Sequence, residues 1–172
     1  MKRLILLMAV IAISMAAVQA QNGISPKKTT FSIGVEPALP VGDFGDFYSF
    51  GIGGSLQVEH KVADDLGITL NAGYINYSGK DYRIGSTEID GGNIGIVPVL
   101  AGVKYYFTPK VYGHAQLGAG IWTEKGASTA FAYSPGIGYY FSEHFDILLK
   151  YVGYSQKGSN SNSIGARLAY NF

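Results

Sequence analysis

The stretch SIGARLAYNF at residues 163–172 alternates without a break between two kinds of side chain. One set is apolar and the other is small or polar: Ile164, Ala166, Leu168, Tyr170 and Phe172 against Ser163, Gly165, Arg167, Ala169 and Asn171. A period of two predicts a β-strand whose two faces meet different surroundings. We also expect the ring of Phe172 to be buried, because an end that nothing holds usually consists of loose polar residues.

Further segments along the chain alternate in the same way, with turn residues between them. The pattern predicts eight strands, at 30–39, 49–60, 66–77, 93–106, 110–122, 130–141, 145–155 and 163–172. The connections after the second, fourth and sixth strands are short, whereas the others are longer, with 78–92 the longest. An even strand count with tight turns at one end and long polar loops at the other is typical of an outer-membrane barrel. We therefore predict an all-β fold over 30–172: an eight-stranded antiparallel up-and-down transmembrane β-barrel with periplasmic termini and turns and longer extracellular loops.

The first 20 residues form a separate region. A basic start is followed by an apolar run over 4–18 and by a small side chain at Ala20. This pattern predicts a secretory signal peptide at 1–20, cleaved between Ala20 and Gln21, and a short lead at 21–29. The alternative, a membrane-anchor helix, would need about 20 apolar residues and different flanks.

Composition narrows the class of protein. Without Lys2 and Arg3, 11 basic side chains remain against 12 acidic ones, a net charge of −1. Because no basic run exists either, the sequence predicts no nucleic-acid partner. The chain has no cysteine, which excludes disulfides. Its charged fraction of 15% is well below the ~25% of soluble domains, as expected of a surface that faces lipid.

A secreted carrier of the lipocalin type is an alternative barrel, because its strands also alternate, with the apolar face inside. Here the polar face is rich in glycine, whereas a water-exposed wall would carry many Lys and Glu side chains. Aromatic residues also gather toward the strand ends, which predicts two belts of rings at the membrane interfaces. The predicted periplasmic belt holds Phe31, Tyr105, Tyr106, Phe107, Tyr112, Tyr139, Tyr140, Phe141, Phe145, Tyr170 and Phe172, and the outer belt holds Phe50, Tyr74, Tyr77, Trp122, Phe131, Tyr133, Tyr151 and Tyr154.

Three segments carry a family resemblance: TFSIGVEPALPVGDFGDFYSFGIGGSLQVEH at 30–60, IVPVLAGVKYYFTPK at 96–110 and YNF at 170–172. They resemble the small outer-membrane β-barrel family, OmpA/OmpX-like proteins also described as porin-family or outer membrane protein β-barrel domain proteins. The resemblance covers the chain after the signal region and implies the fold and the bacterial outer membrane as location. In that family the barrel-assembly machinery reads the terminal aromatic residue, which implies an assembly signal at Tyr170 and Phe172. Arg167 departs from the family pattern, which often has glycine there.

The interior of an eight-stranded barrel is just wide enough for side chains to fill it, so we expect no open pore. An unpaired charge inside would be costly, so the charged residues that face inward predict a paired, hydrogen-bonded network. The expected interior residues are Glu36, Gln57, Glu59, Thr69, Asn71, Lys104, His114, Gln116, Lys150 and Arg167.

The sequence favours no catalytic site, cofactor or metal. Lipid-modifying barrel enzymes would need histidine, serine and a carboxylate together at the outer rim, but His60, His114 and His144 all map to the periplasmic half. The glycine-rich runs at 51–54, 118–120 and 136–138 open no helix and therefore form no phosphate-binding loop. A surface cation between Asp43 and Asp46, in a predicted loop, is an open alternative.

Function is therefore expected in the outer loops. The aromatic segment 42–50 should pack over the barrel mouth or meet a partner, and 78–92 is a second contact surface of mixed charge. We predict a non-enzymatic protein with a structural or surface-interaction role. Its expected partners are outer-membrane lipid, the assembly machinery and an extracellular ligand of unidentified chemistry. A lipid-modifying barrel enzyme and a secreted lipocalin-like carrier are the alternatives.

Overall fold

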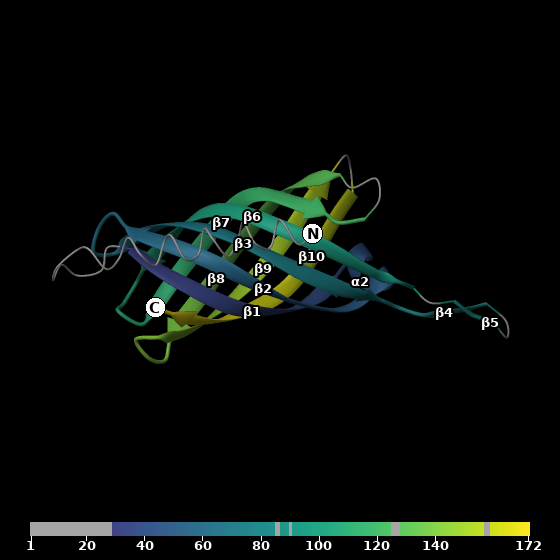
Figure 1. The fold of residues 1–172 in the computed structure, drawn as a ribbon, viewed down its shortest axis with the longest axis horizontal. Helices are drawn as coiled ribbons and strands as arrows, with labels where there is room; N and C mark the ends of the chain where they lie inside the picture. Colours follow the sequence, from purple (N-terminus) through teal and green to yellow (C-terminus); the bar gives the residue numbers. More distant parts are fainter. Residues whose placement is uncertain (1–28, 85–86, 90, 125–127, 157–158) are drawn as a thin grey trace, which may run out of the picture.

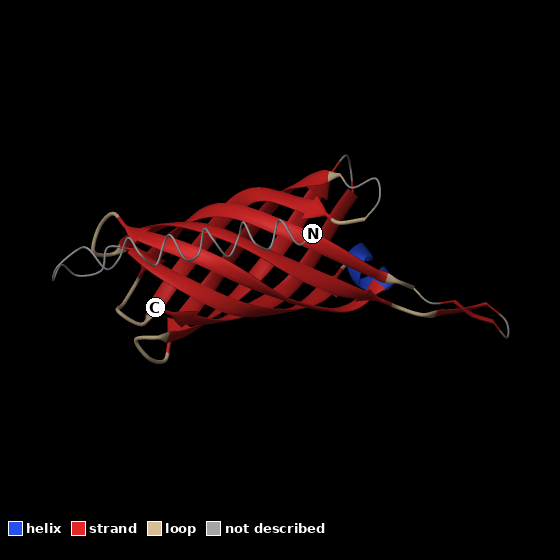
Figure 2. Ribbon diagram, in the orientation of Figure 1, coloured by secondary structure: helices blue, strands red, loops and turns tan. Residues whose placement is uncertain are grey.

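The computed structural model describes residues 29–84, 87–89, 91–124, 128–156 and 159–172. Residues 1–20 and the predicted cleavage site at Ala20 and Gln21 lie outside these ranges, as does most of the lead. The chain forms one closed antiparallel barrel with neighbours in the order β1-β10-β9-β8-β7-β6-β3-β2, drawn in Figures 1 and 2. Its strands are β1 (Thr29–Val41), β2 (Tyr48–Lys61), β3 (Leu66–Gly79), β6 (Asn93–Tyr106), β7 (Val111–Trp122), β8 (Thr129–Tyr140), β9 (Phe145–Gln156) and β10 (Ser159–Asn171).

The last strand closes the barrel against the first, as the sequence predicts. The register of β1 and β10 runs from Ser32 opposite Asn171 to Val41 opposite Asn162. Beyond the end of β10, the backbone N–H of Phe172 donates to the carbonyl of Phe31 at 2.9 Å. Backbone groups in lipid have no water to bond, so a spanning sheet is stable only when its two edges meet.

The end of the barrel that holds the short turns is called the turn end, and the opposite end the loop end. Turns 62–65, 107–110 and 141–144 repeat one backbone pattern, in which the first turn residue donates to the carbonyl of the residue after the turn. In two of them a side chain reinforces the turn: the hydroxyls of Thr108 and Ser142 each accept two backbone N–H groups. Such turns let β2–β3, β6–β7 and β8–β9 follow one another directly.

The loop end carries two elements where the sequence predicts only loops. One is the short helix α2 (Asp43–Phe47), and the other is a ribbon of β4 (Tyr82–Ile84) and β5 (Thr87–Ile89) that extends away from the barrel in Figure 1. Both are too short to show a period in the sequence. No helix in the described ranges has the length and hydropathy needed to cross a membrane.

The two faces of the wall differ as the alternation predicts. Val35 is 54% exposed on the outside, whereas Glu36, the next residue, is 2% exposed on the inside. Along the barrel, Ile, Val and Leu side chains cover the outer face, while Ser, Gly, Gln and charged residues line the interior. An apolar exterior is suited to lipid and rules out a lipocalin-like carrier, which has its apolar face inside.

Six of the predicted belt rings point into the barrel instead. Tyr106, Tyr112 and Tyr140 lie inside the turn end, and Tyr77, Trp122 and Tyr154 lie inside the loop end. Adjacent strand residues face opposite ways, so a run such as Tyr105-Tyr106 must send one ring inward. Phe172 lies where the belt prediction puts it: its ring is on the outer face beside that of Tyr170, 56% exposed, and is not covered by other parts of the protein.

Proline interrupts the ladder at three places in mid-strand. The paired residues skip Pro37 between β1 and β10, Pro98 between β6 and β3, and Pro135 between β8 and β9. Each proline stays paired with the strand on its other side. The reason is that proline has no N–H to donate, and a closed barrel offers no free edge where it could stand without cost. The register is the same before and after each gap, so the gaps do not shift the strands.

Candidate functional site

All ten residues expected in the interior are buried there. Three of them form what we call the central cluster: Glu36, Lys150 and Arg167. Lys150 Nζ donates to Glu36 Oε2 at 2.6 Å, and Arg167 Nε lies 3.7 Å from Glu36 Oε1. The guanidinium also donates to Ser55 Oγ at 2.8 Å and to Ser32 Oγ at 3.1 Å. These bonds join β1, β2, β9 and β10 through the lumen.

A second group, the turn-end cluster, closes the other half of the lumen. Lys104 Nζ donates to Glu59 Oε2 at 2.8 Å and to the hydroxyl of Tyr140 at 3.2 Å, and it lies 4.3 Å from the ring centre of Tyr112. The hydroxyl of Tyr106 donates to Glu59 Oε1 at 2.6 Å. An ammonium between tyrosine rings and a carboxylate is stabilised by both kinds of contact.

Asp146 is the acid that sequence reasoning missed. It is 2% exposed, and its carboxylate accepts the hydroxyl of Tyr112 and the side-chain amide of Asn171. With it, the interior holds three acids and three bases among the described residues, so the charges balance. The sequence contained the information needed to find it, because Asp146 lies four positions before Lys150 and the period of two puts both side chains on the same face of the strand.

Other interior residues have fewer hydrogen-bond partners. His114 Nε2 lies 2.9 Å from Thr69 Oγ1. Among the described residues, Gln57 Oε1, Gln116 Nε2 and Ser134 Oγ are buried and have no hydrogen-bond partner. Water both donates and accepts, and it is the ligand that ordinarily satisfies such atoms inside a protein.

At the loop end, five rings form what we call the aromatic mouth: Phe44, Tyr48, Tyr77, Trp122 and Tyr154. The ring centre of Phe44 lies 4.7 Å from Tyr48, 5.0 Å from Tyr77 and 6.2 Å from Trp122, and Trp122 lies 6.2 Å from Tyr154. Two glycines make room for the deeper rings. A Cβ atom at Gly51 would collide with the ring of Tyr77, and one at Gly120 with the ring of Tyr154.

Helix α2 carries Phe44 into this mouth. Phe44 is its buried residue, whereas Phe47 on the same helix is 59% exposed. Lys80, at the end of β3, donates from its backbone N–H to the carbonyl of Phe47 at 2.8 Å and from Nζ to the carbonyl of Gly45 at 2.6 Å. Of the rings in segment 42–50, Phe44 is buried in the mouth, Tyr48 packs beside it, and Phe47 and Phe50 are exposed.

The histidines do not assemble a hydrolytic site. His60 pairs with Thr29, His114 with Thr69, and His144 with the backbone carbonyl of Asn171. None of the three lies at the loop end. In the part of the chain that the structure describes, no three His, Cys, Asp or Glu side chains are grouped so that they could hold a metal ion. Asp43 and Asp46 are exposed on α2 rather than in a loop.

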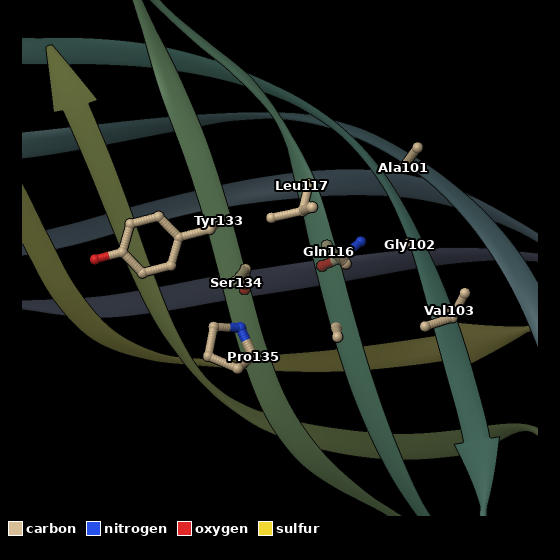
Figure 3. Close-up of a pocket in the computed structure, with 9 residues that line it drawn as sticks. Ala101, Gly102, Val103, Gln116, Leu117, Tyr133, Ser134 and Pro135 are labelled. Carbon is tan, nitrogen blue, oxygen red and sulfur yellow. The ribbon is translucent and has the colours of Figure 1, made fainter.

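The outer wall has a hollow of about 370 Å³ over β6, β7 and β8, shown in Figure 3. Its outward lining is apolar except for one tyrosine, while Gly102, Gln116 and Ser134 form its floor; the outward residues are Ala101, Val103, Ala115, Leu117, Tyr133 and Pro135. Small side chains between larger ones leave this hollow in the outer wall.

Solved structures with the same fold include small outer-membrane barrels. Ail of Yersinia pestis, crystallised with the heparin analogue sucrose octasulfate, shares 19% identity over 84% of this chain and 97% of its own, with a TM-score of 0.58. The backbone structure of Ail in a phospholipid bilayer nanodisc has a TM-score of 0.60 and shares 19% identity over 84% of this chain and 98% of its own. The N-terminal barrel domain of OprF from Pseudomonas aeruginosa has a TM-score of 0.52 and shares 16% identity over 86% of this chain and 100% of its own. These identities show a shared fold alone.

Sequence comparison gives the family. No curated protein sequence matches the chain. The family model described as outer membrane protein beta-barrel domain, however, matches residues 6–172, which include every strand of the barrel. Together with the lipid-suited exterior, this match places the protein in the bacterial outer membrane. The chain therefore belongs to the outer membrane protein beta-barrel domain family.

Proposed function

We propose that the protein is a non-enzymatic barrel that acts at the cell surface through its loop end, with a filled interior and no open pore. The observation that carries this proposal is the contrast between the two parts of the molecule. Inside, Lys150 pairs with Glu36 and Lys104 with Glu59, while Asp146 accepts hydrogen bonds from Tyr112 and Asn171. At the loop end, α2 lies at the mouth of the barrel and the β4–β5 ribbon extends away from the wall, in a position to meet a partner (Figure 1).

The charge of the loop end bears on the kind of partner. Over 42–47, 79–92, 123–128 and 156–160 the sequence holds six acidic and four basic residues. A weakly acidic surface disfavours polyanions, because like charges repel. The heparin analogue seen with Ail is therefore not the ligand class that we propose for this chain. Neutral or cationic surfaces fit better.

The test compares cells that express the full chain with cells that express a variant in which 80–91 is replaced by a short Gly-Ser turn. Retention is measured on surfaces coated with poly-lysine, polystyrene or heparin. We expect the full chain to increase retention on poly-lysine or polystyrene and not on heparin, and the shortened variant to lose the gain while it still migrates as a folded barrel in gels. Equal retention of both strains on all three surfaces would overturn the proposal.

The non-enzymatic part of the proposal has its own measurement. Lipids extracted from outer membranes with and without the protein are compared by mass spectrometry. We expect identical acyl-chain patterns, because no histidine lies at the loop end where a lipid-modifying site would stand. A protein-dependent loss or transfer of an acyl chain would contradict the proposal.

A further inference from the structure

Phe44 occupies the aromatic mouth in the way a ligand would. We propose that the mouth is a binding site for an aromatic ring that carries a hydroxyl group, and that Phe44 fills this site from within the chain until such a ligand displaces it. The inference names a ligand class for the proposed surface role and rests on that role for its biological meaning.

The geometry of the mouth selects a flat ring. Phe44 meets Tyr77 and Trp122 edge to face, at interplanar angles of 73° and 81°. The three ring distances around Phe44 fall in the range of favourable aromatic pairs, about 4.5 to 7 Å. Edge-to-face packing depends on the charge distribution of an aromatic ring, so a saturated ring of the same size gains less from this site.

The polar groups of the mouth point to a hydroxyl on that ring. Trp122 Nε1 and the hydroxyl of Tyr154 are buried, and neither has a hydrogen-bond partner among the described residues. Tyr154 as a whole is 2% exposed. A phenylalanine ring offers these groups nothing, whereas a phenolic oxygen accepts from an indole N–H and its proton can be donated onward. Phe44 thus satisfies the shape of the site and leaves its polar groups unpaired.

The attachment of α2 permits displacement. A helix of five residues makes too few internal bonds to be stable on its own. Its position depends on contacts with the barrel, among them the buried Phe44 ring and the two hydrogen bonds from Lys80. A ligand that takes over the ring's contacts and also bonds Trp122 can therefore shift the balance toward an open mouth.

The chain provides a single reporter, because Trp122 is its one tryptophan. Incorporation of 5-fluorotryptophan gives one fluorine NMR signal, which is followed in the full-length barrel in detergent. The probe is p-cresol, and 4-methylcyclohexanol, of similar size but without an aromatic ring, is the matched control. Phe44→Ala opens the site, and Phe47→Ala removes an exposed ring of the same helix.

We expect p-cresol to shift the signal in a saturable way, with a half-saturating concentration about tenfold lower for Phe44→Ala than for the wild type, because the ligand no longer competes with an internal ring. Phe47→Ala should match the wild type, and 4-methylcyclohexanol should give no saturation. A shift that stays linear in both the wild type and Phe44→Ala, an equal response to both probes, or equal half-saturation of the wild type and Phe44→Ala would overturn the inference.

A second variant covers the case in which Phe44→Ala does not fold. Lys80→Met keeps the ring in place and removes the bond from Nζ to Gly45 that helps to hold α2, so p-cresol should half-saturate at a lower concentration than in the wild type. An unchanged value would then overturn the inference. Failure of this inference can be told from failure of the proposed function. If p-cresol does not saturate the signal but the variant with 80–91 replaced by a Gly-Ser turn still loses surface retention, the surface role is supported and the ring-binding site is refuted.

Discussion

At the scale of single residues, stability rests on charges that are buried but paired. Lys150 and Glu36 are 7% and 2% exposed and lie on strands that are far apart in the sequence. We predict that Lys150→Met lowers the free energy of unfolding in lipid by about 3–5 kcal/mol, because the buried Glu36 carboxylate loses its 2.6 Å bond to the ammonium and keeps only Arg167, at 3.7 Å, as a counter-charge. Urea-dependent unfolding in vesicles measures the change.

Matched variants separate this effect from the loss of a long side chain. Lys110→Met, in an exposed turn, should change the free energy of unfolding by no more than about 0.5 kcal/mol. The double variant Lys150→Met with Glu36→Gln should recover little of the loss, because Arg167, which lies 3.7 Å from Glu36 Oε1, then has no carboxylate to pair with. If Lys150→Met and Lys110→Met unfold at the same urea concentration, Lys150 is hydrated and the central cluster is not a stabilising pair.

Much of the interior could be read from the sequence, because period two assigns each strand residue to one face. Glu36, Lys104 and Arg167 follow directly from this rule. Their partners do not, since the contact between Lys150 and Glu36 crosses 114 positions and depends on how the sheet closes. The inward face of Tyr112 also follows from this rule, because it lies two positions before His114, and the belt prediction overlooked it; its bond to Asp146, like that of Lys150 to Glu36, depends on how the sheet closes.

At the scale of elements, the strands were predictable and the loop-end structures were not. A strand of a dozen residues repeats its pattern several times, so its position is well determined even where its ends move by a residue or two. Helix α2 and the β4–β5 ribbon each contain too few residues for any period. Helix α2 instead follows from a tertiary contact, the burial of Phe44 in the aromatic mouth.

Strand β10 carries the second prediction. Its final N–H groups bond the neighbouring strands, with Asn171 donating to His144 at 2.7 Å and Phe172 donating to Phe31 at 2.9 Å. Deletion of Phe172 removes one of these closing bonds and the last ring of the periplasmic belt. We predict a large fall in the folded, heat-modifiable fraction in cells and a much smaller fall when purified chain refolds into detergent, because only cells supply machinery that could read the terminal ring.

The control for the deletion is Phe172→Tyr, which keeps both the backbone bond and an aromatic ring. It should fold as the wild type in both settings. An equally large fall in cells and in detergent would mean that Phe172 acts through barrel closure alone. Unchanged folding of the deletion in cells would mean that neither the bond nor the terminal ring matters for assembly.

At the scale of the whole molecule, three features hold the barrel together in lipid: its outer face, its interior and its closure. Its exterior is apolar, its interior holds equal numbers of acids and bases among the residues that the structure describes, and its edges are joined by the pairing of β1 with β10. Closure also explains how three mid-strand prolines are accommodated. Each gap has continuous ladder before and after it, so the neighbouring pairs hold the register while one N–H is missing.

The same organisation bears on conductance. Ions that enter from the loop end meet the aromatic mouth first, then the central cluster with Glu36 and Lys150, and then the turn-end cluster, where Lys104 lies among three tyrosines. An interior of eight strands has no width left for a column of water beside these side chains. We therefore predict no steady, porin-sized current from purified monomer in planar bilayers.

A porin of sixteen strands, reconstituted in the same way, shows that the bilayers would report an open channel. Phe44→Ala is the informative variant. It opens the mouth but leaves the turn-end cluster in place, so it too should give no steady current. Lys104→Met, combined with Glu59→Gln, should likewise stay closed, because Tyr106, Tyr112 and Tyr140 still fill that end. Reproducible large steps from wild-type monomer would refute the filled interior, and steps from Phe44→Ala alone would place the whole barrier to ions at the mouth.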